Sequence, residues 1–355
     1  MKKEGLTLNL LNNTITNINP LDTKAMQQAK ERLNSLTKPV GSLGIIEQIA
    51  IQLAGIQGSV DIDVSKKAVL VCAADHGVVE EGISVFNQET TRLMVKNFLI
   101  GGAAINALSR VSEAKVVVAD IGVNGPLFEH PNMINLRVKD GTDNFTQGPA
   151  MTREEAVASL EAGITMAQQQ VDSGSKVLAT GEMGIGNTTA SSAIIAAVSG
   201  LSPEIVTGRG TGIDDKELAV KHQVVAKALA VNNPNQVDGL DILAKVGGLE
   251  IGAMAGMIIG GASLKVPVVI DGFISSAAAL LAYKIAPACR EYIIASHLSE
   301  EPGHQLMLEM LDLEPMLHLN MRLGEGTGAV MAFPILEAAE KVMKEMITFE
   351  ELAKH

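Results

Sequence analysis

The chain has 355 residues, of which 47% are apolar and 19% are charged, so it can bury a large core and does not have the composition of a disordered protein. Its formal charge of −12 argues against nucleic-acid or anionic-membrane partners, which bind clustered Lys and Arg. Two distant cysteines, Cys72 and Cys289, argue against a disulfide framework and favour a reducing, cytoplasmic setting. The residues after Met1 lack an apolar run, so we expect no signal peptide.

The first part of the chain is predicted to be helical. Residues 1–20 are polar and rich in Asn, and we expect them to form an arm. Apolar residues at helical spacing predict helices over 21–36 and about 43–53, and Pro39 and Gly41 force a break between the two. Because these helices precede any strand, we expect a small helical piece packed on a larger unit.

An α/β pattern begins at residue 67. Continuous apolar runs, typical of parallel strands covered on both faces, alternate with helical segments. The pattern predicts an open parallel sheet flanked by helices. The predicted strands are 67–74, 115–119, 176–180, 266–270 and 292–295. The predicted helices lie near 90–99, 103–111, 152–173, 188 onward, 214 onward, 251–264, 303–311 and 326–346.

Polar residues follow these strands. Ligands bind at the carboxyl edge of an open parallel sheet, so we expect these side chains to share one cleft. Each of them alone could equally cap a helix or brace a loop, and it is their repetition that indicates a site. The residues are Asp75, His76, Asp120, Glu182, Asp271, Ser296, His297 and Ser299.

Residues 176–195 predict a buried strand, a glycine-rich turn and a helix. The glycines within 181–186 allow a sharp turn and close approach of a ligand to the backbone. The capping residues 187–189 leave amide donors free, which favours an anion such as phosphate. The alternative is a tight turn with no ligand. Glu182 favours a site, since a carboxylate beside an anion is costly unless it serves a cationic or protic group.

A second carboxylate lies in the glycine-rich segment 321–329. Glu325 has a glycine on each side, so little side-chain bulk shields it. A following helix N-terminus favours its ionised form. Glu325 could have only a capping role, but capping does not require backbone as permissive as Gly-Glu-Gly.

Seven short motifs follow one another along the chain. They are T-K-P-x-G-S-L-G at 37–44, A-D-H-G-V at 74–78, G-E-x-G-x-G-N-T-T at 181–189, K-V-G-G at 245–248, D-G-F at 271–273, S-H-x-S-x-E at 296–301 and R-L-G-E-G-T-G-A at 322–329. Together they resemble the nicotinate-nucleotide–dimethylbenzimidazole phosphoribosyltransferase family, over nearly the whole chain from about Leu21 to Met346.

The resemblance implies a fold, an activity and an assembly. It implies a large Rossmann-like domain over 61–329, a small helical domain built from 1–60 and 330–355, and a homodimer. The implied reaction transfers phosphoribose from nicotinate mononucleotide to 5,6-dimethylbenzimidazole, giving α-ribazole 5′-phosphate and nicotinate for the lower ligand of cobalamin. Neither a metal nor another cofactor is expected, because a cationic pyridinium leaves as neutral nicotinate.

The resemblance also implies roles for single residues. Glu325 corresponds to the general base of the family. The phosphate is expected at the amides near Gly184 and Gly210, with Lys221 as its cation and Ser299 near the nucleotide. Two further roles come from residue chemistry alone. Glu182 could stabilise an oxocarbenium-like transition state or hold the ribose hydroxyls, and Arg209 could be an additional phosphate ligand.

The acceptor base needs a flat, apolar slot. The resemblance places Phe86, Met183 and Leu323 along this slot, with Gln88 close by. Met and Phe are also common in plain protein cores, so core packing is the alternative for Phe86 and Met183.

Two other functions stay open from the sequence. One is a nucleotide-binding or sensor protein without catalysis, which the intact Gly-Glu-Gly segment argues against. The other is a metal-dependent phosphohydrolase that uses Asp75, His76, Asp120 and Asp271. This second function is weaker, because these acids occur singly and the histidines lack recognised ligand spacing. A diphosphate-ribose transferase would present paired acids after a hydrophobic strand, whereas Asp214 and Asp215 open a helix.

Overall fold

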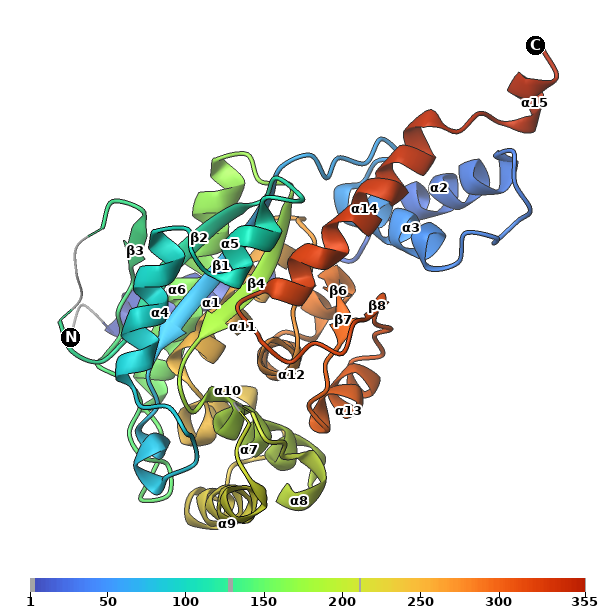
Figure 1. Cartoon of the computed structure of the whole chain (residues 1–355). Helices are drawn as coiled ribbons and strands as arrows, with labels where there is room; N and C mark the ends of the chain where they lie inside the picture. Colours follow the sequence, from blue (N-terminus) through green and yellow to red (C-terminus); the bar gives the residue numbers. More distant parts are fainter. Residues whose placement is uncertain (1–3, 127–129, 211, 355) are drawn as a thin grey trace.

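A parallel six-stranded sheet lies at the centre of the computed structural model, which describes residues 4–126, 130–210 and 212–354 (Figure 1). All neighbouring strands pair in parallel, in the order β3-β2-β1-β4-β5-β6. The five predicted strands are confirmed, and β3 was missed. The strands are β1 Lys67–Ala74, β2 Lys115–Gly122, β3 Met133–Asn135, β4 Val177–Met183, β5 Val268–Ile270 and β6 Ile293–Ala295.

The strand order fixes where a ligand can bind. The chain runs outward from β1 through β2 to β3, then returns to β4 beside β1 and runs outward again through β5 to β6. This reversal between β1 and β4 is the switch point of a Rossmann-like sheet, and it opens a crevice at the carboxyl ends of the strands. The predicted fold class is therefore confirmed.

Helices cover both faces of the sheet. Strand β1 is buried along its whole length, and its side chains alternate between two cores. The core on one face is completed by α6 Arg153–Asp172, α7 Asn187–Ser199, α9 Asp215–Asn232, α10 Gly239–Val246, α11 Leu249–Ser263 and α12 Phe273–Ile285. The core on the other face is completed by α2 Thr23–Ser35, α3 Ile45–Gln57, α4 Glu89–Leu99, α5 Ala104–Ser109 and α14 Thr327–Glu345.

The remaining elements complete the described chain. They are α1 Glu4–Thr16, α8 Pro203–Val206, α13 Gly303–Met310 and α15 Phe349–Leu352, the 3-10 helices η1 Gly77–Glu81 and η2 Pro287–Tyr292, and the parallel pair β7 His297–Leu298 and β8 Leu317–His318. Among the helices of the described ranges, none has both the length and the apolar character that crossing a membrane would require.

The N-terminal segment differs from the expected arm. Residues 4–16 form α1, which packs on α6 and α11, and Leu11 is buried there. The expectation of an arm was wrong because the Asn-rich composition hid a helix that tertiary contacts stabilise.

Helices α2, α3 and the distal part of α14 pack together at one end of the molecule, away from α1 (Figure 1). A hydrogen bond joins α2 to the distal part of α14, since Arg32 Nε donates to the Met343 carbonyl at 2.6 Å. We propose that these three helices form the small helical domain, with α1 belonging to the large one. Their apolar core continues onto one face of the sheet.

Helices α6 and α11 cross with their backbones in direct contact. A Cβ atom added at Gly256 would overlap backbone atoms of Leu160, and one added at Gly163 would overlap those of Ala253. Glycine at these positions lets the two helices approach closely. This crossing anchors the helix layer on one side of the sheet.

Replacing Gly256 by Ala should therefore destabilise the fold. Alanine is the better helix former by about 1 kcal/mol, but the forced separation of two packed helices should outweigh this and lower the free energy of unfolding by about 1–3 kcal/mol. Urea-induced unfolding measures the change. Gly148→Ala is the matched control, because a Cβ at Gly148 meets no atom within 4 Å. An unchanged urea midpoint for Gly256→Ala would contradict the prediction.

Candidate active site

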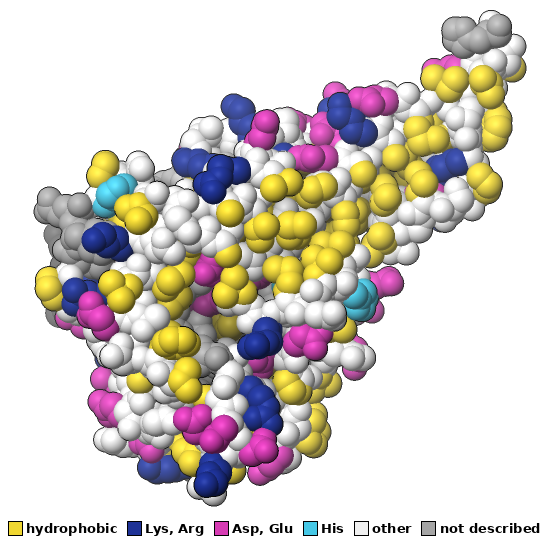
Figure 2. Space-filling view, viewed as in Figure 1, with side chains coloured by type: hydrophobic (Ala, Val, Ile, Leu, Met, Phe, Trp, Pro, Cys, Tyr) yellow, Lys and Arg dark blue, Asp and Glu magenta, His cyan; other side chains and the backbone are white. Residues whose placement is uncertain are grey.

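A cavity of about 470 Å³ opens at the carboxyl edge of the sheet, beside the switch point. Figure 2 shows it as a hollow in the middle of the face, with acidic and basic side chains beside it. Most of the predicted site residues line it, drawn from segments far apart in the sequence. Those residues are Phe86, Glu182, Met183, Gly184, Gly210, Ser299, Leu323 and Glu325.

Glu325 lies on unusual backbone at this cavity. Its φ of 64° is left-handed, and so are those of Gly324 (88°) and Gly326 (92°) on either side. The Glu325 side chain is almost fully buried, and its Oε2 accepts a hydrogen bond from the Ile105 amide at 3.1 Å. Burial raises the pKa of Glu325. The hydrogen bond from Ile105 lowers this pKa in part, and the nearby Asp271 carboxylate raises it further. A raised pKa makes a carboxylate a better proton acceptor near neutral pH.

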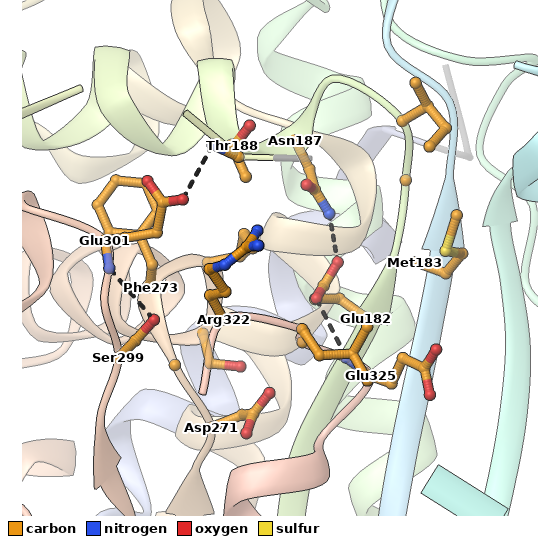
Figure 3. Close-up of a pocket in the computed structure, with 18 of the residues that line it drawn as sticks. Glu182, Met183, Asn187, Thr188, Asp271, Phe273, Ser299, Glu301, Arg322 and Glu325 are labelled. Atoms are coloured by element: carbon orange, nitrogen blue, oxygen red, sulfur yellow. Dashed lines mark hydrogen bonds between the residues drawn. The ribbon is translucent and has the colours of Figure 1, made fainter. Parts of the chain in front are cut away.

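Glu182 lies at the end of β4, next to Glu325 (Figure 3). Its Oε1 accepts the Glu325 amide at 3.3 Å, and its Oε2 accepts the Asn187 side-chain amide. Burial, together with the carboxylates of Glu250 and Asp271, raises the pKa of Glu182 to about 8. At pH 7 this side chain is therefore mostly protonated.

The glycine-rich turn that lines the cavity lies where α7 begins. The N-cap of this helix is Gly186, with φ 100°, rather than the residues 187–189 that were expected to cap it. Lys221 lies behind the cavity wall and donates from Nζ to Thr188 Oγ1 at 2.9 Å and to the Gly208 carbonyl at 3.2 Å. Burial lowers the pKa of Lys221 to about 8, so it is mostly charged at neutral pH.

Ser299 and Glu301 close the cavity on the side opposite Glu325 (Figure 3). Glu301 Oε1 accepts the Gly210 amide at 3.0 Å. The Ser299 amide donates to His304 Nδ1 at 2.8 Å, and His304 Nε2 contacts Ser276 Oγ at 2.9 Å. Burial lowers the pKa of His304 to about 3, so its ring is neutral and its Nδ1 can accept the hydrogen bond from the Ser299 amide. This loop is thus held by a buried histidine.

Apolar side chains line the same cavity as the two glutamates. Phe86 and Leu323 keep 49% and 56% of their surface exposed, and Met183 is the last residue of β4. Met94 also lines the cavity, and Phe273 lies on the other side of it, beside Ser299 and Glu301 (Figure 3). A planar ring could lie against such a surface within reach of Glu325.

The comparisons with known proteins agree with this geometry. A family model described as "Phosphoribosyltransferase" matches residues 18–353. The chain is 57% identical over 345 residues to the nicotinate-nucleotide–dimethylbenzimidazole phosphoribosyltransferase of Desulforamulus reducens, covering 97% of this chain and 98% of that protein. The chain belongs to the nicotinate-nucleotide–dimethylbenzimidazole phosphoribosyltransferase family. The Halalkalibacterium halodurans relative of the same name is 52% identical over 95% of this chain and 94% of its own length.

The fold of this phosphoribosyltransferase also matches a solved structure. CobT from Thermus thermophilus superposes with a TM-score of 0.90 at 48% identity, covering 93% of this chain and 98% of that one. The resemblance drawn from the seven motifs is therefore confirmed.

Several polar residues expected in one cleft lie elsewhere in this phosphoribosyltransferase. Asp120 pairs with Arg137 at 2.7 Å, and Asp75 accepts the Asn124 amide at 2.8 Å. His76 contacts Glu250 at 2.6 Å, fully buried. None of these three strand-end residues lines the cavity, so the expectation of one shared cleft is wrong for them. At His76 the reason is visible, because the turn at Gly184 packs against its ring and against Ala74.

More of the expected residues lie outside the cavity. Gln88 lines a separate hollow, where its side chain donates to the His76 carbonyl at 2.9 Å and accepts from Asn124 Nδ2 at 2.8 Å. Arg209 pairs with Asp215 at the start of α9. Ser296 donates to the Asp271 carbonyl behind the cavity wall.

Some cavity residues were missed by sequence reasoning. The motifs around Arg322 and Glu301 offered a local signal, since both residues lie inside conspicuous segments. Thr188 was considered only as a helix cap, and Phe273 only as part of a motif. Within the described ranges, no three His, Cys, Asp or Glu side chains gather as a metal site would require.

Proposed function

We propose that this protein transfers phosphoribose from nicotinate mononucleotide to 5,6-dimethylbenzimidazole or a related base, giving α-ribazole 5′-phosphate and nicotinate for the lower ligand of cobalamin. The observation that carries the proposal is the make-up of the cavity. Glu325 and several apolar side chains line it together with the Gly184 and Gly210 turns, and Lys221 lies behind those turns. The name shared by the relatives supports the same reaction.

The chemistry needs a proton acceptor and an orienting cavity. Glu325 takes the N–H proton of the azole while the other ring nitrogen attacks the ribose anomeric carbon. The bond from that carbon to the pyridinium nitrogen breaks, and its electron pair stays on nicotinate. Attack from the opposite face converts a β-nucleotide into an α-nucleotide in one displacement.

Glu182 is better suited to hold the ribose than to supply negative charge. Its pKa of about 8 keeps it mostly protonated at neutral pH, so it can donate a hydrogen bond to a ribose hydroxyl. The hydrogen bond from Asn187 fixes the orientation of the carboxyl group. This choice favours one of the two roles that the sequence left open.

For the phosphate we propose the Gly184 and Gly210 loops with Lys221, and Ser299 close to the nucleotide. The amide-rich turn at the α7 N-terminus favours an anion, and Lys221 supplies the charge from behind Thr188. A bound phosphate would raise the pKa of Lys221 and keep it charged.

The pH dependence of kcat/KM should be bell-shaped. Glu325 must be ionised, so activity should fall as pH drops through its raised pKa, at a higher pH than for an ordinary glutamate with a pKa of about 4.3. Lys221 must be charged, so activity should fall again as pH rises through about 8. Lys221→Arg should move the alkaline limb upward, because a guanidinium stays charged. If the alkaline limb does not move in Lys221→Arg, the group that titrates there is Glu182 instead.

The direct test of the function is a product analysis. Purified protein is incubated with nicotinate mononucleotide and 5,6-dimethylbenzimidazole, and the products are identified by mass and by anomeric configuration. Release of nicotinate with an α-linked product supports the proposal. Binding of nicotinate mononucleotide without nicotinate release would instead support the sensor function.

We also propose a homodimer. In Figure 2 hydrophobic side chains form a band that runs from beside the cavity over α14 to the helical domain. Contiguous apolar surface of this kind is typical of subunit interfaces. A single-chain mass in sedimentation equilibrium at micromolar concentration would contradict the dimer.

A further inference from the structure

The start of α14 is capped by a carboxylate from a distant part of the chain. The N-cap residue, Gly326, has no side chain with which to cap the helix. Asp271, which follows β5, takes this place instead. Its carboxylate accepts the backbone amides of Gly326 at 3.1 Å, Gly328 at 2.7 Å and Ala329 at 3.1 Å.

The segment that Asp271 holds carries Glu325. Three consecutive residues, 324–326, have left-handed backbone, and the central one is not a glycine. Left-handed backbone is strained for a residue with a side chain and persists only where the surroundings enforce it. The backbone amides that donate hydrogen bonds to Asp271 begin at the residue after Glu325, Gly326.

Asp271 is in turn fixed to the sheet. Its amide donates to Thr180 Oγ1 on β4 at 3.1 Å, and its carbonyl accepts from Ser296 Oγ after β6 at 3.3 Å. Only 2% of Asp271 is exposed. A chain of contacts therefore runs from the middle of β4 and the residues after β5 and β6, through Asp271, to the backbone that directly follows Glu325.

We propose that Asp271 is a positioning residue that locks the backbone of Glu325 and so holds its carboxylate where the acceptor base must bind. In Figure 3 Asp271 lies between Ser299 on one side and Glu325 on the other. Asp271 acts through Glu325 and takes no proton from the substrate itself. The inference rests on the proposed function, in which Glu325 is the base.

The charge of Asp271 gives this role a distinct signature. The charged or titratable side chains that line the cavity with Glu325 are Glu182, Asp271, His297, Glu301 and Arg322, and α5 contributes the uncharged Ile105 amide. After burial, the Asp271 carboxylate is the group that raises the pKa of Glu325. Replacing Asp271 by Asn removes this charge, so the acid limb of the pH profile should move to lower pH.

The test is a double-mutant cycle between Asp271→Asn and Glu325→Gln. Asp271→Asn should lower kcat/KM about 10- to 100-fold in the wild-type background, because a small misplacement of the base is costly. It should cost less than about threefold in the Glu325→Gln background, where no base remains to be positioned. Equal losses in both backgrounds, or an unmoved acid limb, would overturn the proposal.

Asp238→Asn is the matched control. Asp238 caps α10 by accepting the Leu240 and Asp241 amides at 3.0 and 3.1 Å, and it does not line the cavity. This variant should leave the acid limb in place. Should Asp271→Asn not fold, Thr180→Val enters the same cycle, because it removes the hydroxyl that accepts the Asp271 amide while keeping the side-chain shape. Thr180→Val should likewise lower kcat/KM in the wild-type background and have little effect on it in the Glu325→Gln background. Equal decreases of kcat/KM in both backgrounds would overturn the proposal.

A readout without turnover separates this inference from the proposed function. In protein labelled with ¹³C at glutamate carboxyl carbons, the Glu325 signal is the one absent from Glu325→Gln. Its titration midpoint should fall in Asp271→Asn and stay unchanged in Asp238→Asn. If the wild type shows no transferase activity, the function fails while this midpoint still tests the Asp271–Glu325 coupling. A midpoint that does not move contradicts the coupling.

Discussion

Replacing Glu325 by Gln should lower kcat for phosphoribosyl transfer by about 10²–10⁴-fold, which is the usual contribution of a general base. Glutamine keeps an oxygen for the Ile105 amide and fits the same space, so the backbone and the cavity should be preserved. It cannot take the azole proton. Steady-state kinetics with nicotinate mononucleotide and 5,6-dimethylbenzimidazole measure the loss, and the acid limb of the pH profile should disappear with it.

Glu300→Gln is the matched control for this variant. Glu300 is exposed and does not line the cavity, so the same change of charge there should leave kcat within about twofold. Thermal unfolding and nicotinate mononucleotide affinity establish that Glu325→Gln is folded with an intact cavity. A folded Glu325→Gln enzyme with near-wild-type kcat would remove Glu325 from the role of base.

Replacing Lys221 by Met should raise KM for nicotinate mononucleotide by about 10- to 100-fold, as expected for a hydrogen bond to a charged group. Methionine keeps much of the length of the buried side chain but removes the charge and both hydrogen bonds of Nζ. Nicotinate riboside, which lacks the phosphate, should react equally well with both enzymes. The ratio of kcat/KM for the two substrates is therefore the measurement.

Lys216→Met controls for charge on the same helix. Lys216 lies on the exposed first turn of α9, and its replacement should change neither substrate ratio nor stability appreciably. If Lys221→Met loses activity equally with nicotinate mononucleotide and with nicotinate riboside, then Lys221 supports the loop of Gly208 and does not bind phosphate.

The fold was predictable to the extent that its signals are local. Strands buried on both faces appear as unbroken apolar runs, and β1, β2 and β4 were found by this signal. Strand β3 has three residues and only partial burial, so it gives no comparable run. Helix α1 is stabilised by contacts with α6 and α11, which a single sequence does not reveal.

Site residues could be predicted where they lie close together in the sequence, within one glycine-rich motif. Glu182 and Gly184 lie two residues apart where β4 ends, and Glu325 lies between glycines, so local sequence located all three. The capping of α14 by Asp271 joins residues 55 or more positions apart, and no local pattern reports such a contact. Asp75 and Asp120 were misassigned because strands that end at one edge need not open into one cavity.

Helix α14 connects the chemistry to a remote part of the molecule. Its first turn adjoins Glu325, and its far end packs against α3, where Leu336 and Met343 are buried. A helix behaves as a stiff rod, and Pro334 in its middle, which has no amide hydrogen to offer, is where bending is easiest. A tilt of α2 and α3 would therefore be transmitted along α14 to the backbone beside Glu325, the proposed proton acceptor. We expect changes in the packing of α3 to alter catalysis in this way without any contact with substrate.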